Sequence, residues 1–181
     1  MQDYIEFLKS KEFTVQDAGF DVPLSAIHQT LFHYQRDITR WAIKRGRVAL
    51  FEDVGLGKTI QFGEFARQID LPTLIISPLA VVHQTIDELH KLIDMHVRYV
   101  RSSKDLQFDE CKFYITNYEM VDKFNADDFE VVILDESSIL KNLTGKMRNA
   151  LIEQFKDTPY RLCATATPAP MIVTGKPSHN L

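Results

Sequence analysis

The sequence predicts an α/β fold in which helices cover both faces of a mostly parallel central sheet. Short apolar runs of strand length, such as 48–51 and 73–77, alternate with segments whose apolar residues recur at helical spacing. The run at 130–136, EVVILDE, has four consecutive apolar residues, which is typical of a strand buried on both faces. A glycine-containing turn at 52–59, EDVGLGKT, lies between one such run and a helical segment. Ligands of such sheets bind beyond the carboxyl ends of the strands, where this turn lies.

The remaining elements continue the alternation along the chain. One helix is predicted at 31–46, where Gly46 ends it, and a second follows the glycine turn. A third is predicted where Val82, Ile86, Leu89 and Ile93 recur at helical spacing, and a fourth at about 143–156. Further strands are predicted at 96–100, 112–116 and 160–167. Residues 1–30 mix short apolar clusters with charges, and we expect one or two short helices there, ahead of the core.

Length and composition favour one globular domain. The chain has 181 residues, of which 45% are apolar and 25% charged, the proportions of an ordinary globular protein. No apolar stretch approaches the ~20 residues of a membrane span, and the first residues lack an apolar signal core. Cys111 and Cys163 lie far apart, so we expect buried thiols in a reducing cytoplasm. A net charge of −4 argues against general adhesion to nucleic acid but permits a local basic track.

The turn GLGKT at 55–59 carries the strongest local signal. Gly55 and Gly57 allow consecutive N–H groups to curl around an anion, and the positive end of the following helix points into the same space. Lys58 would contact the β- and γ-phosphates of a nucleotide, and the Thr59 hydroxyl would bind Mg²⁺. The general G-x-x-x-x-G-K-[ST] pattern has a further glycine where this chain has Glu52. The alternative is a glycine turn that only caps the helix.

A second signal is LDESS at 134–138. A carboxylate at the end of a buried central strand is costly unless it serves a ligand or partner. Asp135 would hold the Mg²⁺ that bridges the phosphates, and Glu136 would orient or deprotonate the attacking water. Taken alone, the Asp-Glu pair is more simply a strand-end turn. Paired with the phosphate loop, it forms the second half of one ATP–Mg²⁺ site.

The order of these blocks resembles the first, RecA-like lobe of superfamily-2 helicases and translocases. The resemblance is to the Swi/Snf-like branch, in the short-looped forms of phages and bacteria. That branch has an acidic residue before Met-Gly-Leu-Gly-Lys-Thr, and EDVGLGKT matches it with Asp53 in the acidic place and Val54 for the methionine. The branch also lacks the first glycine of the general pattern, so Glu52 is no objection. In LDESSILKN, Ser137 and Ser138 replace the Ala-His of the usual box.

The resemblance implies roles for further residues. HYQRD at 33–37 resembles the block whose glutamine reads adenine, which makes Gln35 the candidate, and an amide can both donate to and accept from the adenine edge. CATATPAP at 163–170 resembles the block that couples hydrolysis to movement, with Thr165 and Thr167 as its hydroxyls. The implied nucleotide contacts are Gln35, Asp53, Gly55, Leu56, Gly57, Lys58, Thr59 and Ile60. The implied nucleic-acid contacts are Pro78, Thr116, Asn117 and Lys141.

The resemblance covers about residues 31–170 and implies a RecA-like first lobe, with an irregular tail at 171–181. We expect an ATP-binding lobe of a DNA-dependent ATPase with ATP and Mg²⁺ as cofactors and DNA as a weakly held partner, and a second lobe on another chain is a candidate partner. A second lobe normally supplies an arginine finger, commonly worth ~10³–10⁵ in rate, so this chain alone is expected to bind ATP–Mg²⁺ but hydrolyse it poorly. The alternative is a stand-alone, non-motor module that binds nucleotide or a partner.

Weaker features receive simpler interpretations. Arg36, Arg40 and Lys44 recur along one predicted helix, which favours a solvated basic face over a phosphate contact. Trp41 lies one helical turn after Ile38, which favours core packing. The six histidines include no His-x-x-x-His pair, and no Cys-x-x-Cys is present, so we expect no cluster of metal ligands.

Overall fold

A six-stranded, all-parallel sheet forms the centre of the molecule in the computed structural model, which describes residues 17–141 and 145–167. The strand order is β1-β6-β5-β2-β4-β3, and every pairing is parallel, which confirms the predicted fold class. The strands are β1 (Arg47–Phe51), β2 (Thr73–Ser77), β3 (Arg98–Tyr99), β4 (Phe113–Asn117), β5 (Val131–Leu134) and β6 (Tyr160–Thr165).

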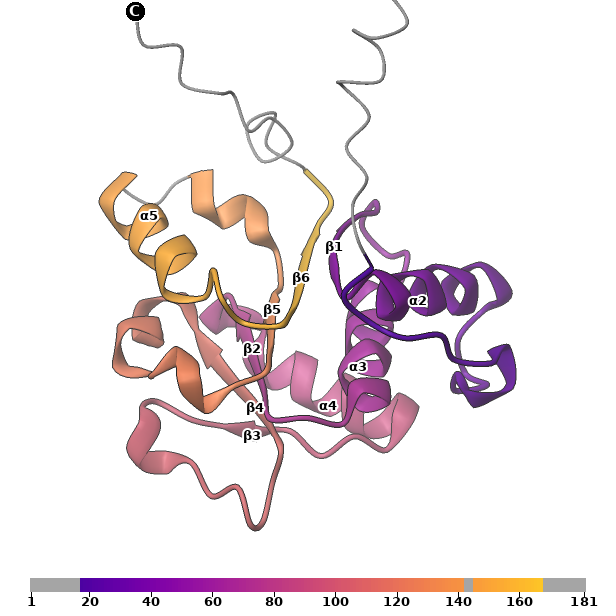
Figure 1. The fold of residues 1–181 in the computed structure, drawn as a ribbon, viewed down its shortest axis with the longest axis horizontal. Coiled ribbons are helices and arrows are strands. Elements are labelled where there is room, and N and C mark those ends of the chain that lie inside the picture. The colour runs from indigo at the N-terminus through magenta and orange to yellow at the C-terminus, as the bar shows by residue number, and fades with distance from the viewer. Residues whose placement is uncertain (1–16, 142–144, 168–181) are drawn as a thin grey trace, which may run out of the picture.

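Helices cover both faces of this sheet (Figure 1). Three of them lie on one side: α2 (His33–Arg45), α3 (Lys58–Ile69) and α4 (Val82–Ile93). The other side carries α5 (Gly145–Gln154). The 3-10 turns are η1 (Leu24–Ala26), η2 (Leu79–Val81), η3 (Ser103–Asp105), η4 (Tyr118–Lys123), η5 (Ala126–Asp128) and η6 (Ser137–Lys141). The helices predicted after residue 30 thus form, with the left-handed Gly46 ending α2 at φ 69°.

Alternation along the central strands builds two cores, one on each face of the sheet. Ile75 of β2 pairs in register with Ile115 and Ile133, and all three belong to the core under α2, α3 and α4. The positions adjacent to these along the strands, including Leu74 and Tyr114, belong to the second core on the α5 side. Successive side chains of a strand point to opposite faces, so each apolar run supplies both cores.

The predicted strand at 96–100 is reduced to two residues. β3 is an edge strand that pairs only with β4. Val97 and Val100 on either side of it are still buried, so burial extends further than the ladder. The predicted helices before residue 17 and the predicted tail at 171–181 lie outside the described residues; within 17–30 the structure has the single turn η1.

The prediction that Trp41 packs in the core is wrong, because 46% of it is exposed. The face of α2 that packs inward is formed by Gln35, Thr39, Ala42 and Ile43, and position 41 lies about 200° around the helix from position 39. Trp41 therefore faces away from the core.

The basic face of α2 is largely solvated, as predicted, since Arg40 and Lys44 are exposed, and its side chains also bond to the segment that precedes the helix. Arg40 and Lys44 form ion pairs with Asp21, with N–O distances of 3.8 and 2.9 Å. Arg36 Nη2 donates a hydrogen bond of 2.6 Å to the carbonyl oxygen of Leu24.

The two cysteines are free thiols and are partly exposed rather than fully buried. No helix within the described residues is both long and apolar enough to span a membrane.

Candidate nucleotide-binding site

The order of the strands brings the predicted catalytic segments together. β1, β6 and β5 are neighbours, and parallel strands end at the same edge of a sheet. The segments that leave this edge carry the phosphate loop after β1, Thr165 at the end of β6, and Asp135 and Glu136 after β5. The Glu52 N–H donates to the carbonyl oxygen of Thr165 at 3.3 Å, so the loop is tied directly to β6.

The phosphate loop has a backbone that only its glycines adopt without strain. Gly55 and Gly57 have φ values of 84° and 78°, and Gly57 is the N-terminal cap of α3, where no side chain caps the helix. A Cβ added at Gly55 would meet no atom within 4 Å, so the loop is open at this point. Uncapped N–H groups at a helix N-terminus attract anions.

Lys58 lies folded into its own loop. Its Nζ donates to the carbonyl oxygens of Glu52 and Asp53, both at 2.9 Å. Within the described part of the chain it forms no ion pair with a carboxylate. A cation held only by neutral carbonyl groups suits the binding of a phosphate, so the residues present fit the predicted nucleotide.

Gln35 connects the start of α2 to the phosphate loop. Its Oε1 accepts a 2.8 Å hydrogen bond from the Phe32 N–H, and its Nε2 donates a 2.8 Å bond to the carbonyl oxygen of Leu56. The side chain is 4% exposed. A Cβ placed on Gly57 would lie 2.4 Å from Gln35 Nε2, so the glutamine packs against the loop as well as bonding to it.

Sequence reasoning missed a second buried amide that supports the loop. Gln61 is fully buried, and its Nε2 donates to Glu52 Oε2 at 2.6 Å. Its position between the predicted apolar residues of α3 gave no signal of burial. Because α3 is packed by α2, by α4 and by the sheet, its polar residues are buried as well as its apolar stripe.

Asp135 lies where β5 ends. Its Oδ2 accepts a 2.8 Å hydrogen bond from Ser77 Oγ, and the Tyr118 hydroxyl donates to its carbonyl oxygen at 2.8 Å. Burial raises the pKa of the Asp135 carboxyl, and the neighbouring Glu136 raises it further, against the lowering effect of Ser77. A half-buried carboxylate whose side-chain partner is a neutral hydroxyl suits a cation, so the donor set fits the predicted Mg²⁺.

Glu136 is held in place by β6. Its Oε1 accepts a 2.9 Å hydrogen bond from Thr165 Oγ1 and another from Ser138 Oγ. Thr165 Oγ1 in turn accepts from the Thr167 N–H at 3.1 Å. Glu136 has φ 49°, a left-handed conformation that is uncommon for a residue other than glycine and that concentrates at functional sites. These contacts join the acidic block to both predicted coupling threonines.

Residues 34–174 match the family described as the SNF2-related domain. The chain belongs to this family.

Similar proteins include a SWI/SNF-related matrix-associated actin-dependent regulator of chromatin subfamily A-like protein 1 of Xenopus laevis, 29% identical over 82% of this chain. The DNA annealing helicase and endonuclease ZRANB3 of Mus musculus is 28% identical over 91% of this chain. This SNF2-related domain spans 17% of the length of each. The Sulfolobus solfataricus SWI2/SNF2 ATPase core, solved in complex with dsDNA, superposes with a TM-score of 0.63 and 23% identity, covering 86% of this chain and 35% of that one.

The predicted nucleic-acid residues of this SNF2-related domain are less exposed than expected. Thr116 and Asn117 are 0% and 1% exposed, and the Asn117 side chain bonds to the Tyr99 hydroxyl at 3.2 Å and to Glu119. Their side chains lie in the interior because both end a central strand, so the structure does not place them at a surface. Pro78 is partly exposed, and the side chain of Lys141 lies outside the described part.

The remaining predicted nucleotide contacts divide by exposure. Ile60 is 6% exposed and belongs to the core, so its side chain does not reach the loop surface. Leu56 is 40% exposed, and its carbonyl oxygen accepts from Gln35 and from the Tyr34 hydroxyl. Asp53 is exposed and Thr59 is partly exposed.

Proposed function

We propose that this chain is the ATP–Mg²⁺-binding lobe of a DNA-dependent ATPase motor. The observation that carries the proposal is the meeting of three segments at one sheet edge: the loop with Lys58, the half-buried Asp135, and Glu136 bonded to Thr165. Phosphoryl transfer depends chiefly on positioning and on neutralising charge. These groups supply both, and membership of the SNF2-related domain family supports the same activity.

The phosphate groups of ATP would bind to the uncapped N–H groups at the start of α3. The Lys58 ammonium would leave the carbonyl oxygens of Glu52 and Asp53 for the β- and γ-phosphate oxygens. The Thr59 hydroxyl and the Asp135 carboxylate would hold Mg²⁺, which neutralises charge on the phosphates when bound. A bound cation would also favour the ionised form of Asp135, whose pKa burial otherwise raises.

Glu136 would orient the attacking water. Its bond to Thr165 fixes the carboxylate, and the bond from the Thr167 N–H to Thr165 connects it to the segment that leaves β6. A displacement of that segment would move Glu136, which is a physical route for coupling hydrolysis to movement.

Gln35 would read the adenine with the bonding capacity that remains to it. A side-chain amide has two donor hydrogens and two acceptor lone pairs. The bonds to Phe32 and Leu56 use one of each, so one donor and one acceptor remain for the base.

DNA is the proposed polymer. ZRANB3 is described as a DNA annealing helicase, and the Sulfolobus ATPase core was solved with dsDNA. Binding by this lobe alone would be weak and would fall with salt, because contacts to the phosphate backbone are electrostatic.

Phosphate release by the purified 181-residue chain, with and without duplex DNA, tests the proposal. An arginine finger from a second lobe commonly contributes ~10³–10⁵ in rate, and the 181 residues assayed correspond to 17% of the length of the relatives. We expect ATP hydrolysis close to the rate of a Glu136→Gln variant and no stimulation by DNA. Robust DNA-stimulated turnover that the variant abolishes would contradict the proposal that this lobe is inactive alone.

A non-motor module that binds nucleotide or a partner is the alternative function. Light scattering with and without ATP–Mg²⁺ separates the two. A chain that self-associates through the nucleotide edge would favour the module, whereas a monomer favours a lobe that works within a larger motor.

A further inference from the structure

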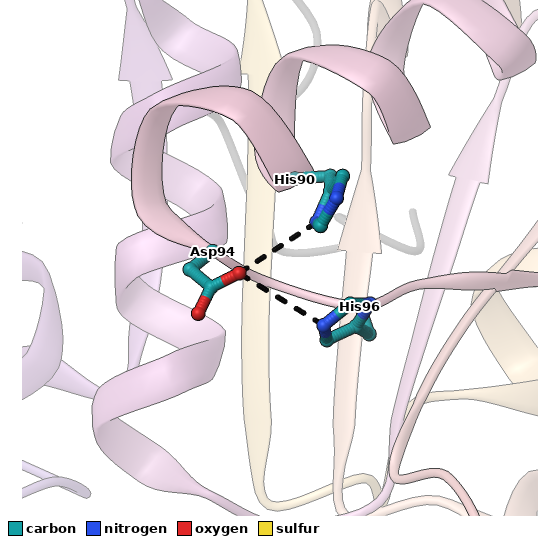
Figure 2. A group of neighbouring side chains, drawn as sticks. All are labelled: His90, Asp94 and His96. Atoms are coloured by element: carbon teal, nitrogen blue, oxygen red, sulfur yellow. Dashed lines mark ion pairs between the residues drawn. The ribbon is translucent and has the colours of Figure 1, made fainter.

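We propose that His90, Asp94 and His96 form a binding site for a divalent transition metal of the zinc class. One ligand atom from each residue lies within 4.8 Å of the other two. Figure 2 shows that both imidazoles approach the same carboxylate oxygen of Asp94. The absence of a His-x-x-x-His or Cys-x-x-Cys pair predicted no metal-ligand cluster. The pattern here is His-x-x-x-Asp-x-His.

The site lies away from the nucleotide. Asp94 follows the last residue of α4, and β3 begins at Arg98. Since all six strands are parallel, the start of β3 lies at the amino edge of the sheet, whereas the phosphate loop lies at the carboxyl edge. This metal site is therefore separate from the Mg²⁺ that the proposed ATPase requires, and it does not depend on that function.

The spacing of the three groups is close to that of a coordination shell. The distance from Asp94 Oδ1 is 3.8 Å to His90 Nδ1 and 3.9 Å to His96 Nε2. Ligands of a tetrahedral zinc ion at about 2.0–2.1 Å lie roughly 3.3 Å from one another. Each imidazole therefore needs to approach the carboxylate by about half an ångström, and the two imidazole nitrogens, which lie within 4.8 Å of each other, need to approach by up to about 1.5 Å, which side-chain rotations achieve.

Neither imidazole of the cluster is hydrogen-bonded to the Asp94 carboxylate. Separations of 3.8 and 3.9 Å are too long for hydrogen bonds. All three side chains are more than half exposed, and exposed ion pairs of this kind contribute little to stability. The two imidazole rings lie against each other with centroids 4.7 Å apart, and their nitrogens face the same carboxylate oxygen without a hydrogen bond to it, which is an arrangement that a metal ion completes.

The backbone that carries the ligands is anchored on both sides. Met95 and Val97 are 2% and 8% exposed and alternate with Asp94 and His96, so burial of one pair directs the other outward. The Asp94 N–H donates to the carbonyl oxygen of His90 at 3.1 Å. The exposed ligands therefore extend from a fixed backbone, and only side-chain torsions need to be ordered when a metal binds.

The chemistry of the donors selects the metal class. Two imidazole nitrogens and one carboxylate oxygen suit Zn²⁺, Co²⁺, Ni²⁺ or Cu²⁺, whereas Mg²⁺ and Ca²⁺ prefer sites made only of oxygen. Three protein ligands leave a fourth zinc position for water or for a group from another molecule. The geometry thus points to an open, exposed site rather than a closed structural one.

Calorimetric titration of ZnCl₂ into the untagged, metal-stripped 181-residue chain, without nucleotide, tests this proposal. We expect one zinc ion per chain at this site, with a higher thermal unfolding temperature in zinc because the ion binds the native state. His90→Ala and His96→Ala should each weaken zinc binding by at least about 10-fold. Asp94→Asn, which keeps a residue that tolerates the left-handed backbone (φ 51°), should weaken it as well.

The matched control is His83→Ala, an exposed histidine on the same helix outside the cluster. It should bind zinc like the unsubstituted chain. Cobalt supplies a readout that does not depend on unfolding, since Co²⁺ at this site should give visible absorption bands that His96→Ala removes and His83→Ala retains. The proposal is overturned if the chain shows no heat of binding at about 1 mM zinc. It is equally overturned if His83→Ala weakens binding as much as His96→Ala does.

Discussion

Replacing Gln35 by alanine tests whether this side chain braces the phosphate loop. Gln35 is 4% exposed and bonds at one end to the Phe32 N–H and at the other to the carbonyl oxygen of Leu56, each at 2.8 Å. The alanine variant removes both bonds. Leu56 O still accepts from the Tyr34 hydroxyl at 3.2 Å, whereas the Phe32 N–H loses its partner within the described structure.

The expected cost follows from these two bonds. A neutral hydrogen bond contributes about 1 kcal/mol, and a donor left unsatisfied costs about 1–3 kcal/mol. Because Leu56 O retains other donors, most of the cost comes from the Phe32 N–H, and the sum is about 2–3 kcal/mol. For a domain of this size 1 kcal/mol corresponds to about 2–4 °C, so the unfolding temperature should fall by roughly 4–12 °C.

Thermal unfolding followed by circular dichroism measures the effect. Gln84→Ala, at an exposed position of α4, is the matched control and should unfold at nearly the original temperature. Gln35→Glu keeps the acceptor for the Phe32 N–H but replaces the donor to Leu56. In that variant, hydrogen exchange should speed up at residues 52–57. If Gln35→Ala unfolds at the same temperature as Gln84→Ala, the glutamine does not brace the loop.

Three other substitutions or modifications probe single features of the site. Asp135→Asn should raise the unfolding temperature at pH 7. Burial raises the pKa of this carboxyl above the 3.8 of an ordinary one, so its ionised form destabilises the native state at neutral pH. The advantage of asparagine should shrink as the pH falls through the raised pKa and vanish below 3.8. An advantage that grows on acidification would contradict this sign. Burial raises the pKa of Cys163 from its ordinary 9.0 to about 11. Because only the thiolate reacts, alkylation at pH 8 in a Cys111→Ser background should be about 100-fold slower in the folded chain than in urea. Equal rates would show that the thiol is not shielded. Gly57→Ala should lower the free energy of unfolding by at least about 1 kcal/mol, because φ is 78° and the new Cβ would lie 2.4 Å from Gln35 Nε2. Calorimetric unfolding should detect the loss. An unchanged unfolding temperature would argue against this packing.

The sheet was predictable because its signals are local. Runs such as 73–77 and 130–136 are apolar on both faces, and strands of that kind occur in parallel sheets. The phosphate loop was predictable for a similar reason, since glycine is the residue that adopts positive φ without strain, and Gly55 and Gly57 both have positive φ. The two glycines shape the loop through their own backbone, and the Lys58 side chain bonds to carbonyl groups of the same loop.

Features that depend on distant partners were not predictable. Gln61 is buried because α2 and α4 pack on either side of its helix. Trp41 is exposed because the inward face of α2 was centred on Thr39 and Ile43 rather than on Ile38. His96 joins His90 only because the chain turns at the left-handed Asp94. In each case a tertiary arrangement outweighs a local pattern.

Calorimetric titration of ATP–Mg²⁺ into the chain and its Lys58→Ala variant tests the central claim most directly. The loss of a charged hydrogen bond to phosphate corresponds to about 1.5–3 kcal/mol, or roughly 10- to 150-fold in Kd. The unsubstituted chain and a Lys104→Ala control, which removes an exposed lysine far along the sequence, should bind alike, while Lys58→Ala should bind at least about 10-fold more weakly. Equal affinity of Lys58→Ala and Lys104→Ala would contradict the assignment of this loop as the nucleotide site.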